Sequence, residues 1–194
     1  MIDTSTSTIK NLLLGHRSFF SSHETKDINF RINSLKRFKS AIHTFEKEIT
    51  ISLYTDLHKS AEEAYLTEIS IVLQEIENHI KHLKSWAKPK KVTTPIHLLP
   101  SSSKIIYEPL GVSLIIAPWN YPFQLLMNSL VGAISGGCCA MLKPSPYTPN
   151  VAMVMEKLIH ETFDEKYVSI VQGGREVNSV LLEQRFDIIF FNLK

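Results

Sequence analysis

The chain has 194 residues, 44% of them hydrophobic, and its 21 Lys and Arg residues against 19 Asp and Glu residues give a formal net charge of +2. A chain of this length and composition buries a sizeable core and forms one or two domains. Because the charges are spread along the sequence without a basic face, nucleic acid is not an expected partner.

Membrane and targeting signals are not evident in the sequence. The longest apolar runs are strand-length and are interrupted by Pro, Asn or Gly, whereas a transmembrane helix needs roughly 20 apolar residues, so no membrane span is expected. Residues 1–10 are polar and rich in Ser and Thr, without the apolar core of a signal peptide. These features predict a cytoplasmic protein.

The cysteines and histidines show no spacing typical of a metal site. Cys138 and Cys139 are adjacent, so neither a structural disulfide nor a metal centre is expected, and both are interpreted as small buried side chains. The eight histidines, including His79 and His82, form no triad or ligand pattern and are expected to be solvated.

Apolar residues at steps of three and four predict a long amphipathic helix from residue 28 to residue 49. The stripe consists of Ile28, Ile32, Leu35, Phe38, Ile42, Phe45 and Ile49. Basic residues occupy the opposite side, namely Lys36, Arg37, Lys39 and Lys47. Residues 18–27, which precede this helix, are expected to form a loop.

A second helix is predicted to begin after Ser60, because Ser60 and Glu63 have the spacing of a capping box. Its apolar stripe consists of Leu66, Ile69, Leu73, Ile76, Ile80 and Leu83. Pro89 ends the helix, after lysines that the helix dipole favours at this end.

Residues 92–110 are predicted to form a protruding β-hairpin. Its strands are expected at residues 95–99 and 104–108, joined around residues 100–103. An exposed strand of this kind can add to a strand of another chain. The hairpin is therefore also the candidate surface for self-association or for pairing with a second chain.

From residue 111 onward, strands and helices alternate. Strands are predicted at residues 112–117, 138–142, 167–171 and 187–191, and helices at residues 123–135, 149–162 and 176–184. This order predicts right-handed crossovers and a mostly parallel sheet. The expected fold class is α/β, a Rossmann-like sheet with amino-terminal helices and the protruding hairpin.

Polar side chains follow two of the predicted strands. Trp119 and Asn120 come after the first strand, and Lys143 ends the second. Open α/β sheets bind ligands at the carboxyl ends of their strands, so an amide and an ammonium group are expected side by side in one site. By residue type alone, Asn120 also suits a role in closing its turn, and Lys143 suits a strand-end lysine that reaches water.

Several motifs in a fixed order resemble the amino-terminal part of class 3 aldehyde dehydrogenases, over about residues 24–191. They are LYTDLHKS (53–60), EAYLTEI (63–69), KSW (84–86), YEPLGV (107–112), PWNYP (118–122), LKPS (142–145), QGG (172–174) and FDIIFF (186–191). The resemblance implies oxidation of an aldehyde to a carboxylic acid with NAD or NADP as cofactor.

The resemblance also implies roles for individual residues. Asn120 is expected to donate its amide to the oxyanion formed during catalysis, a type of contact whose loss typically lowers turnover by about 10²–10³. Lys143 is expected to hold the adenosine ribose. The residues expected to bind the cofactor are Ala117, Pro118, Trp119, Lys143, Ser145 and Gly173.

Two positions depart from the family pattern. Pro146 replaces the glutamate that usually follows Lys-Pro-Ser, which removes an acceptor near the ribose and is expected to impair cofactor binding or change cofactor choice. Cys138 replaces an asparagine, and neither Cys138 nor Cys139 matches the family's catalytic cysteine.

The sequence after Phe191 is Asn192-Leu193-Lys194, where the family continues Thr-Gly-Ser. The expected domains are a helical segment (1–91), a bridging hairpin (92–110) and an incomplete dinucleotide-binding domain (111–194), with the catalytic domain absent. The chain is expected to be inactive alone, because the nucleophilic cysteine and the base glutamate have no counterpart. The alternative is a non-catalytic interaction module that pairs with a second half or an intact homologue.

Overall fold

The computed structural model describes residues 3–191, and the departure from the family pattern at residues 192–194 lies outside them. A four-stranded parallel sheet forms the centre of the described chain, in the order β5-β4-β3-β6. Its strands are β3 (Val112–Ile116), β4 (Cys139–Lys143), β5 (Val168–Ile170) and β6 (Ile188–Phe191). The predicted α/β fold with a parallel sheet is confirmed.

The strand register brings three carboxyl ends to one edge of the sheet. Ile116, the last residue of β3, pairs with Lys143 of β4 on one side and with Phe191 of β6 on the other. The chain moves outward from β3 to β4 and β5 and then returns to place β6 on the opposite side of β3. Open α/β sheets bind ligands where the strand order reverses in this way.

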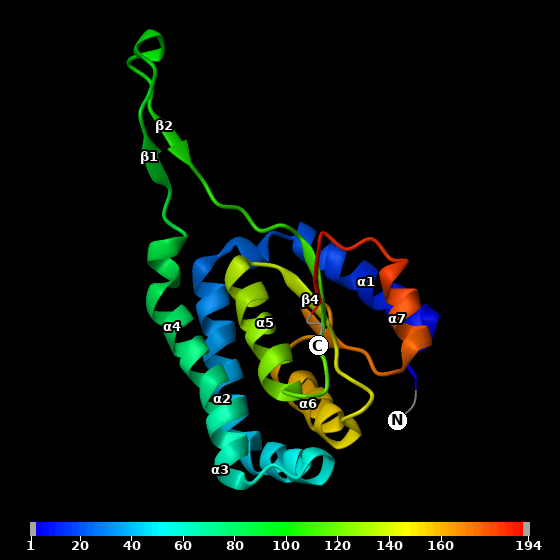
Figure 1. Cartoon of the computed structure of the whole chain (residues 1–194). Coiled ribbons are helices and arrows are strands. Elements are labelled where there is room, and N and C mark those ends of the chain that lie inside the picture. The colour runs from blue at the N-terminus through cyan, green and yellow to red at the C-terminus, as the bar shows by residue number, and fades with distance from the viewer. Residues whose placement is uncertain (1–2, 192–194) are drawn as a thin grey trace.

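Helices cover both faces of the sheet (Figure 1). The helices between the strands are α5 (Pro122–Gly136), α6 (Pro149–Thr162) and α7 (Arg175–Leu182). Helices α5 and α6 pack on one face, and α1 (Thr6–Ser21) and α7 lie on the other. Helix α2 (Ile28–Leu57) packs on α5 and α6, and α4 (Ser70–Trp86) packs on α2 and α5, which gives this side a second helical layer.

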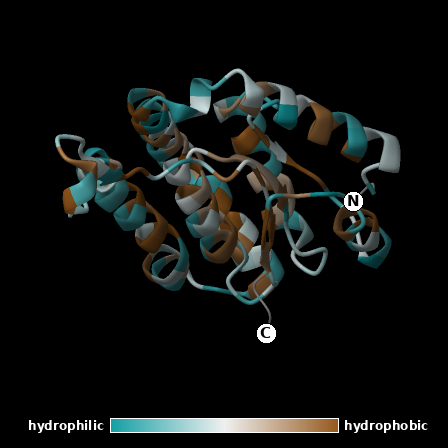
Figure 2. Ribbon diagram, turned by 90° about the horizontal axis from the view of Figure 1, so that it is seen from above, coloured by the Kyte–Doolittle hydropathy of each residue, from teal (hydrophilic) through white to brown (hydrophobic). Residues whose placement is uncertain are grey.

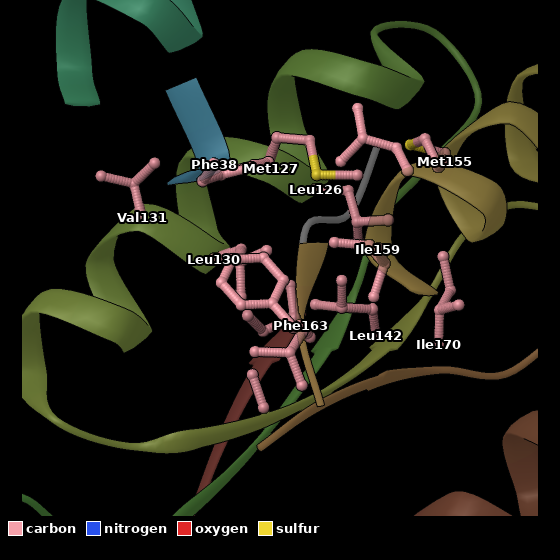
Figure 3. Close-up of a cluster of buried hydrophobic side chains, with 14 of the residues drawn as sticks. Phe38, Leu126, Met127, Leu130, Val131, Leu142, Met155, Ile159, Phe163 and Ile170 are labelled. Carbon is pink, nitrogen blue, oxygen red and sulfur yellow. The ribbon is translucent and has the colours of Figure 1, made fainter. Parts of the chain in front are cut away.

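The amphipathic stripe predicted for α2 faces the core. All its members from Ile32 to Ile49 are buried, and Ile28 packs at its margin. Phe38 reaches the cluster formed by α5, α6 and the sheet, where Met127 lies beside it in Figure 3 and its ring centre lies 5.7 Å from that of Phe163. In Figure 2 teal and brown segments alternate along the helices, as is typical of amphipathic helices. The helix continues to Leu57 and ends at His58, whose φ of 55° is left-handed.

Acidic residues of the amino-terminal helices cap the helices of the sheet domain. Neither α5 nor α6 has a side-chain cap of its own, and each begins with a proline. Asp56 of α2 accepts a hydrogen bond from Val151 N in the first turn of α6 at 2.9 Å. Carboxylates stabilise helix amino ends through both hydrogen bonds and the helix dipole.

The domain boundaries predicted at residues 91 and 111 stay predictions.

The first helix was not expected from the sequence. Residues 18–27 were predicted to be a loop, yet α1 extends to Ser21 and a short 3₁₀ turn follows at Glu24–Lys26. Ser5 caps α1 by accepting from Thr8 N. Among many Ser and Thr residues, this helix carries a short apolar stripe of Ile9, Leu13 and Phe19. The stripe packs against the sheet, and this packing stabilises the helix.

The second predicted helix contains a π-helical turn. The capping bond from Glu63 N to Ser60 Oγ is present at 3.1 Å, and α3 (Ala61–Ala64) leads into the π turn Tyr65–Ile69 before α4. The wider turn changes the phase of the helix. Leu66, predicted to be buried, is therefore exposed, and Glu68 is buried instead.

The hairpin protrudes from the body between α4 and β3, as Figure 1 shows. Its strands are β1 (Lys90–Val92) and β2 (Ser103–Ile105), joined by a loop that contains a 3₁₀ turn at Ile96–Leu98. The strand predicted at 95–99 is wrong, whereas the one predicted at 104–108 overlaps β2 at residues 104–105 only. Pro95 and Pro100 have no N–H to donate, so the intervening segment cannot continue a ladder.

Three histidines are not solvated as expected, and one of them, His82, is half-buried and stacks on Trp86 with ring centres 5.6 Å apart. His16 is fully buried, and its Nε2 lies 3.0 Å from Glu165 O. His79 is half-buried, with Nδ1 2.6 Å from Ser135 Oγ and its ring edge against Trp86.

Among residues 3–191, no helix is both long and apolar enough to span a bilayer.

Candidate cofactor pocket and active-site turn

A pocket of about 360 Å³ lies at the carboxyl ends of β3, β4 and β6. It also includes the start of α7, so four elements meet at the edge where the strand order reverses. The pocket residues are Ile116, Ala117, Pro118, Trp119, Lys143, Pro144, Ser145, Pro146, Tyr147, Gly174, Arg175, Asn178 and Phe191.

Lys143 supplies a buried ammonium group to this pocket. Only 1% of the residue is exposed, and Nζ donates to Pro144 O at 2.7 Å. Burial lowers the pKa of Lys143 to about 8, because removing the ammonium from water disfavours its charged form, and the negative charge of Asp3 opposes this effect. Since this is its one acceptor among residues 3–191, the ammonium has donors left for an anionic or hydroxyl-bearing ligand.

The loop between β5 and α7 leaves its backbone open to the pocket. Gly173 has a φ of +145°, and a Cβ there would lie 2.3 Å from Val177 Cγ2, so only glycine fits beside the first turn of α7. At Gly174 a Cβ would meet nothing within 4 Å. Gly174 begins α7 without a side-chain cap, and uncapped helix amino ends attract phosphate groups.

These observations fit a dinucleotide. Lys143 and Arg175 provide two cations, the first turn of α7 has no side-chain cap on its N–H groups, and Gly174 provides room for close approach of a ligand. Phosphates take cations and helix amino ends, while ribose hydroxyls take an ammonium or a carboxylate.

Asn120 lies in the turn between β3 and α5 rather than in this pocket. Its carbonyl oxygen accepts a hydrogen bond from Lys59 Nζ at 3.1 Å. Its side-chain Oδ1 is buried and has no hydrogen-bond partner among the described residues. The expected juxtaposition of the Asn120 amide with Lys143 is therefore limited to the same edge of the sheet, where β3 and β4 end side by side.

A buried ion pair between Lys59 and Glu68 contacts the turn that contains Asn120. Lys59 Nζ lies 2.5 Å from Glu68 Oε1 and 4.1 Å from the centre of the Tyr121 ring. Glu68 Oε2 accepts from the backbone N–H groups of Phe123 and Gln124, each at 3.0 Å. Burial raises the pKa of Glu68, and the Lys59 hydrogen bond and the two N–H groups oppose that rise. The pair thus links α3–α4 to the first turn of α5.

The structure brings together five of the residues predicted to bind a cofactor: Ala117, Pro118, Trp119, Lys143 and Ser145. Ser145 is buried, and its Oγ accepts from Tyr147 N at 3.3 Å, so it also shapes the turn. Gly173 is not in the lining, and its neighbour Gly174 is. The assignment of these residues to a cofactor stays a prediction.

Sequence reasoning missed Lys59, Glu68 and Arg175. The signal for Glu68 was its spacing of four residues from Ala64 and from Val72, both buried, which places a carboxylate on an apolar face. Buried charges of this kind require partners, so such a glutamate predicts a cation nearby. Arg175 offered no comparable signal.

The two cysteines are buried thiols. Both Cys138 and Cys139 are free, and burial raises the pKa of Cys139 to about 12. A thiol needs a lowered pKa to act as a nucleophile at neutral pH. In the described part of the chain, no group of three or more His, Cys, Asp or Glu residues has the arrangement of a metal site.

The sequence pattern of the aldehyde dehydrogenase family matches residues 7–192. The 4,4'-diaponeurosporen-aldehyde dehydrogenase of Staphylococcus aureus is 49% identical over 175 residues, which are 90% of this chain and 38% of that protein. Aldehyde dehydrogenase family 3 member I1, chloroplastic, of Arabidopsis thaliana is 41% identical over 175 residues, 90% of this chain and 32% of that protein.

The fold agrees with a solved structure titled "Substrate bound state of Staphylococcus Aureus AldH". The TM-score is 0.92 with 48% sequence identity, and the match covers 94% of this chain and 40% of that one. A parallel α/β sheet with a pocket at its strand ends defines the class as an open α/β fold of the kind that binds ligands at this edge. This chain belongs to the aldehyde dehydrogenase family. It spans about two-fifths of the length of these relatives.

Proposed function

We propose that this chain supplies the cofactor-binding and oxyanion-stabilising part of an NAD(P)-dependent aldehyde dehydrogenase, which oxidises an aldehyde to a carboxylic acid. The observation that carries the proposal is the convergence of Lys143, Arg175 and the uncapped start of α7 on one pocket, in a chain that matches the family over residues 7–192. The family generally uses NAD(P).

Each residue has a defined part in this proposal. Lys143 and Ser145 hold the nucleotide, and Ala117, Pro118 and Trp119 form the wall at the end of β3. NAD(P), when bound, supplies the electron acceptor for the oxidation. Asn120, whose Oδ1 is enclosed, donates through Nδ2 to the oxygen of the substrate carbonyl as negative charge develops on it.

The attacking thiol is proposed to lie outside this chain. Neither cysteine here is exposed, and Cys139 is held in its protonated form. We accordingly propose that the 194-residue chain binds cofactor but produces no NADH from an aldehyde by itself. A cytoplasmic location stays a prediction, since one of its relatives is named as chloroplastic.

The cofactor site is tested by calorimetric titration of NAD into the chain and into Lys143→Met. We expect the wild-type chain to bind and the variant to bind at least about tenfold more weakly, as one charge-assisted hydrogen bond contributes roughly 1.5–3 kcal/mol. Since the pKa of Lys143 is about 8, wild-type affinity should also fall as the pH rises above that value and the ammonium loses its proton.

Lys36→Met is the matched control, because Lys36 is exposed on the outer face of α2 and does not line the pocket. It removes the same charge and should leave the affinity for NAD unchanged. A wild-type chain that gives no heat and no thermal shift with NAD or NADP would exclude the cofactor role.

The second candidate is a non-catalytic interaction module, and the protruding hairpin favours it. Apolar side chains on the hairpin are exposed: Ile96 by 84%, Leu99 by 60% and Ile106 by 56%. Apolar surface held away from the body in this way marks an interaction site. The occupant proposed is a second copy of this chain, which adds to the exposed edges of β1 and β2.

Self-association is tested by sedimentation equilibrium of the wild-type chain and of the double variant Ile96→Asp/Ile106→Asp. We expect the wild-type chain to form a dimer or larger assembly and the variant to be monomeric, because two charges cannot be buried in an apolar contact. Leu14→Asp, at a position on α1 that is 66% exposed, is the control and should leave the mass unchanged. A monomeric wild-type chain would contradict the proposal.

A further inference from the structure

The first described residues form a strap across the end of β5, defined here as residues 3–5. Thr4 N donates to Gln172 O at 2.9 Å, and Gln172 N donates to Thr4 Oγ1 at 2.9 Å. On the other side Ser5 caps α1. The strap is thus attached through Ser5 to α1, which covers the sheet, and through Thr4 to Gln172, two residues after the end of β5.

Gln172 is itself held in place. Its side-chain Nε2 donates to Ala152 O and to Glu156 Oε2, each at 3.1 Å. Only 5% of Gln172 is exposed. The reciprocal pair of hydrogen bonds with Thr4 therefore joins the strap to a rigid part of the molecule, which limits the positions open to the neighbouring residue Asp3.

This attachment places the Asp3 carboxyl group beside Gly173, the neighbour of the pocket residue Gly174. Asp3 Cγ lies 3.2 Å from the position that a Cβ on Gly173 would take. Its charge also acts on Lys143, whose pKa it raises against the effect of burial. Asp3 is exposed and has no ion pair with any side chain of residues 3–191.

A carboxylate that is not itself a lining residue thus lies next to a pocket that two cations line. Lys143 and Arg175 attract phosphates, as does the start of α7. A carboxylate accepts hydrogen bonds from the two hydroxyls of an adenosine ribose but repels a phosphate on the 2′ oxygen. The sign of the charge at Asp3 thus distinguishes the two dinucleotides.

We propose that Asp3 accepts hydrogen bonds from the adenosine ribose of the cofactor and gives this pocket a preference for NAD over NADP. The inference rests on the proposed function, because it assumes that the pocket binds a dinucleotide. Asp3 reaches the site from the amino-terminal strap, a segment that lies more than a hundred residues away in sequence from Lys143.

The experiment is a calorimetric titration of NAD and of NADP into the full chain, its Asp3→Asn variant and a control. Asn keeps the shape of Asp and removes its charge. We expect the wild-type chain to bind NAD more tightly, and Asp3→Asn to weaken NAD and strengthen NADP so that their affinity ratio falls about tenfold, since like charges close together disfavour a wrong ligand.

Glu161→Gln is the matched control, because Glu161 is exposed on α6 and its removal changes the net charge equally. It should leave the ratio unchanged. Thr4→Val, which breaks one bond of the strap, should lower the ratio in the same direction as Asp3→Asn. Circular dichroism of each variant confirms that the fold is retained.

The outcomes distinguish failure of the role proposed for Asp3 from failure of the proposed cofactor site. If both dinucleotides bind and Asp3→Asn leaves their ratio unchanged, or weakens both equally, the role of Asp3 is overturned while the cofactor site stands. If neither dinucleotide binds to the wild-type chain, the proposed function fails and the role of Asp3 fails with it.

Discussion

Glu68→Gln is expected to destabilise the chain by about 3–5 kcal/mol, the usual cost of removing one partner from a buried ion pair. The substitution leaves the Lys59 ammonium buried without a countercharge, 3.1 Å from Asn120 O. It also weakens the cap on α5, because the carboxylate that accepts from Phe123 N and Gln124 N loses its charge. Urea denaturation of both chains at neutral pH measures the loss.

A double-mutant cycle shows whether the loss comes from the pair. Lys59→Met/Glu68→Leu replaces both charges by apolar groups, so it should cost clearly less than the sum of the single variants Lys59→Met and Glu68→Leu. The exposed pair Lys157–Glu48, separated by 3.2 Å with both side chains about half exposed, is the comparison. Glu48→Gln should cost no more than about 1 kcal/mol. Equal costs at both sites would refute the structural role of Glu68.

Stability is expected to fall by about 3 kcal/mol between pH 6.5 and pH 4 because of His16 alone. Burial lowers the pKa of His16 from 6.5 to about 4, and the hydrogen bond with Glu165 O opposes this only partly. Because Nε2 donates to that carbonyl, Nδ1 is unprotonated, and it is buried with no hydrogen-bond partner in the part of the chain that the structure describes. Protonation would place an unsatisfied charged N–H in the core.

The direction of the pH dependence follows from the number of protons that the unfolded and folded chains bind at His16. Between pH 6.5 and pH 4 the unfolded chain binds a proton at His16 and the folded chain does not, so acid favours unfolding. The measurement is the free energy of unfolding in urea at several pH values, compared with that of His16→Gln, which should lack this part of the slope. His97→Gln, on the exposed hairpin, should keep it. Parallel curves for wild type and His16→Gln would disprove the assignment.

Local sequence patterns predicted the sheet domain well. Each predicted strand from residue 112 onward lies within two residues of an observed one, and the helices between them begin and end close to their predicted bounds. Here the apolar strands and the glycine and proline turns agree with the final packing, so local preference and tertiary structure point the same way.

The sequence predicted less where distant contacts decide the local structure. The hairpin strands were misplaced because their edges have no neighbouring sheet to select the register. Helix α1 was missed because its apolar stripe becomes significant only against the sheet that it covers. Leu66 was misassigned because the π turn at Tyr65–Ile69 interrupts the helical period.

The candidate site shows the same division. Lys143 and the turn at Ala117–Trp119 follow strands, so their arrival at one edge of the sheet was predictable from the alternation of strands and helices. The residues from other segments that contact this edge of the sheet were not predictable in the same way. Glu68, Lys59 and Asp3 come from the amino-terminal segments, and no local rule states which helix or strap lies beside which strand end.

By itself, the sequence determined the family, the parallel α/β arrangement and the strand ends at which the candidate pocket lies. Those properties follow from apolar periodicity and short motifs, which act within a few residues. Only the tertiary structure decided that Glu68 caps α5, that Lys59 holds the Asn120 turn and that Asp3 borders the pocket of Lys143. Burial makes charged groups find partners through space, and chain folding brings those partners from positions far apart in sequence.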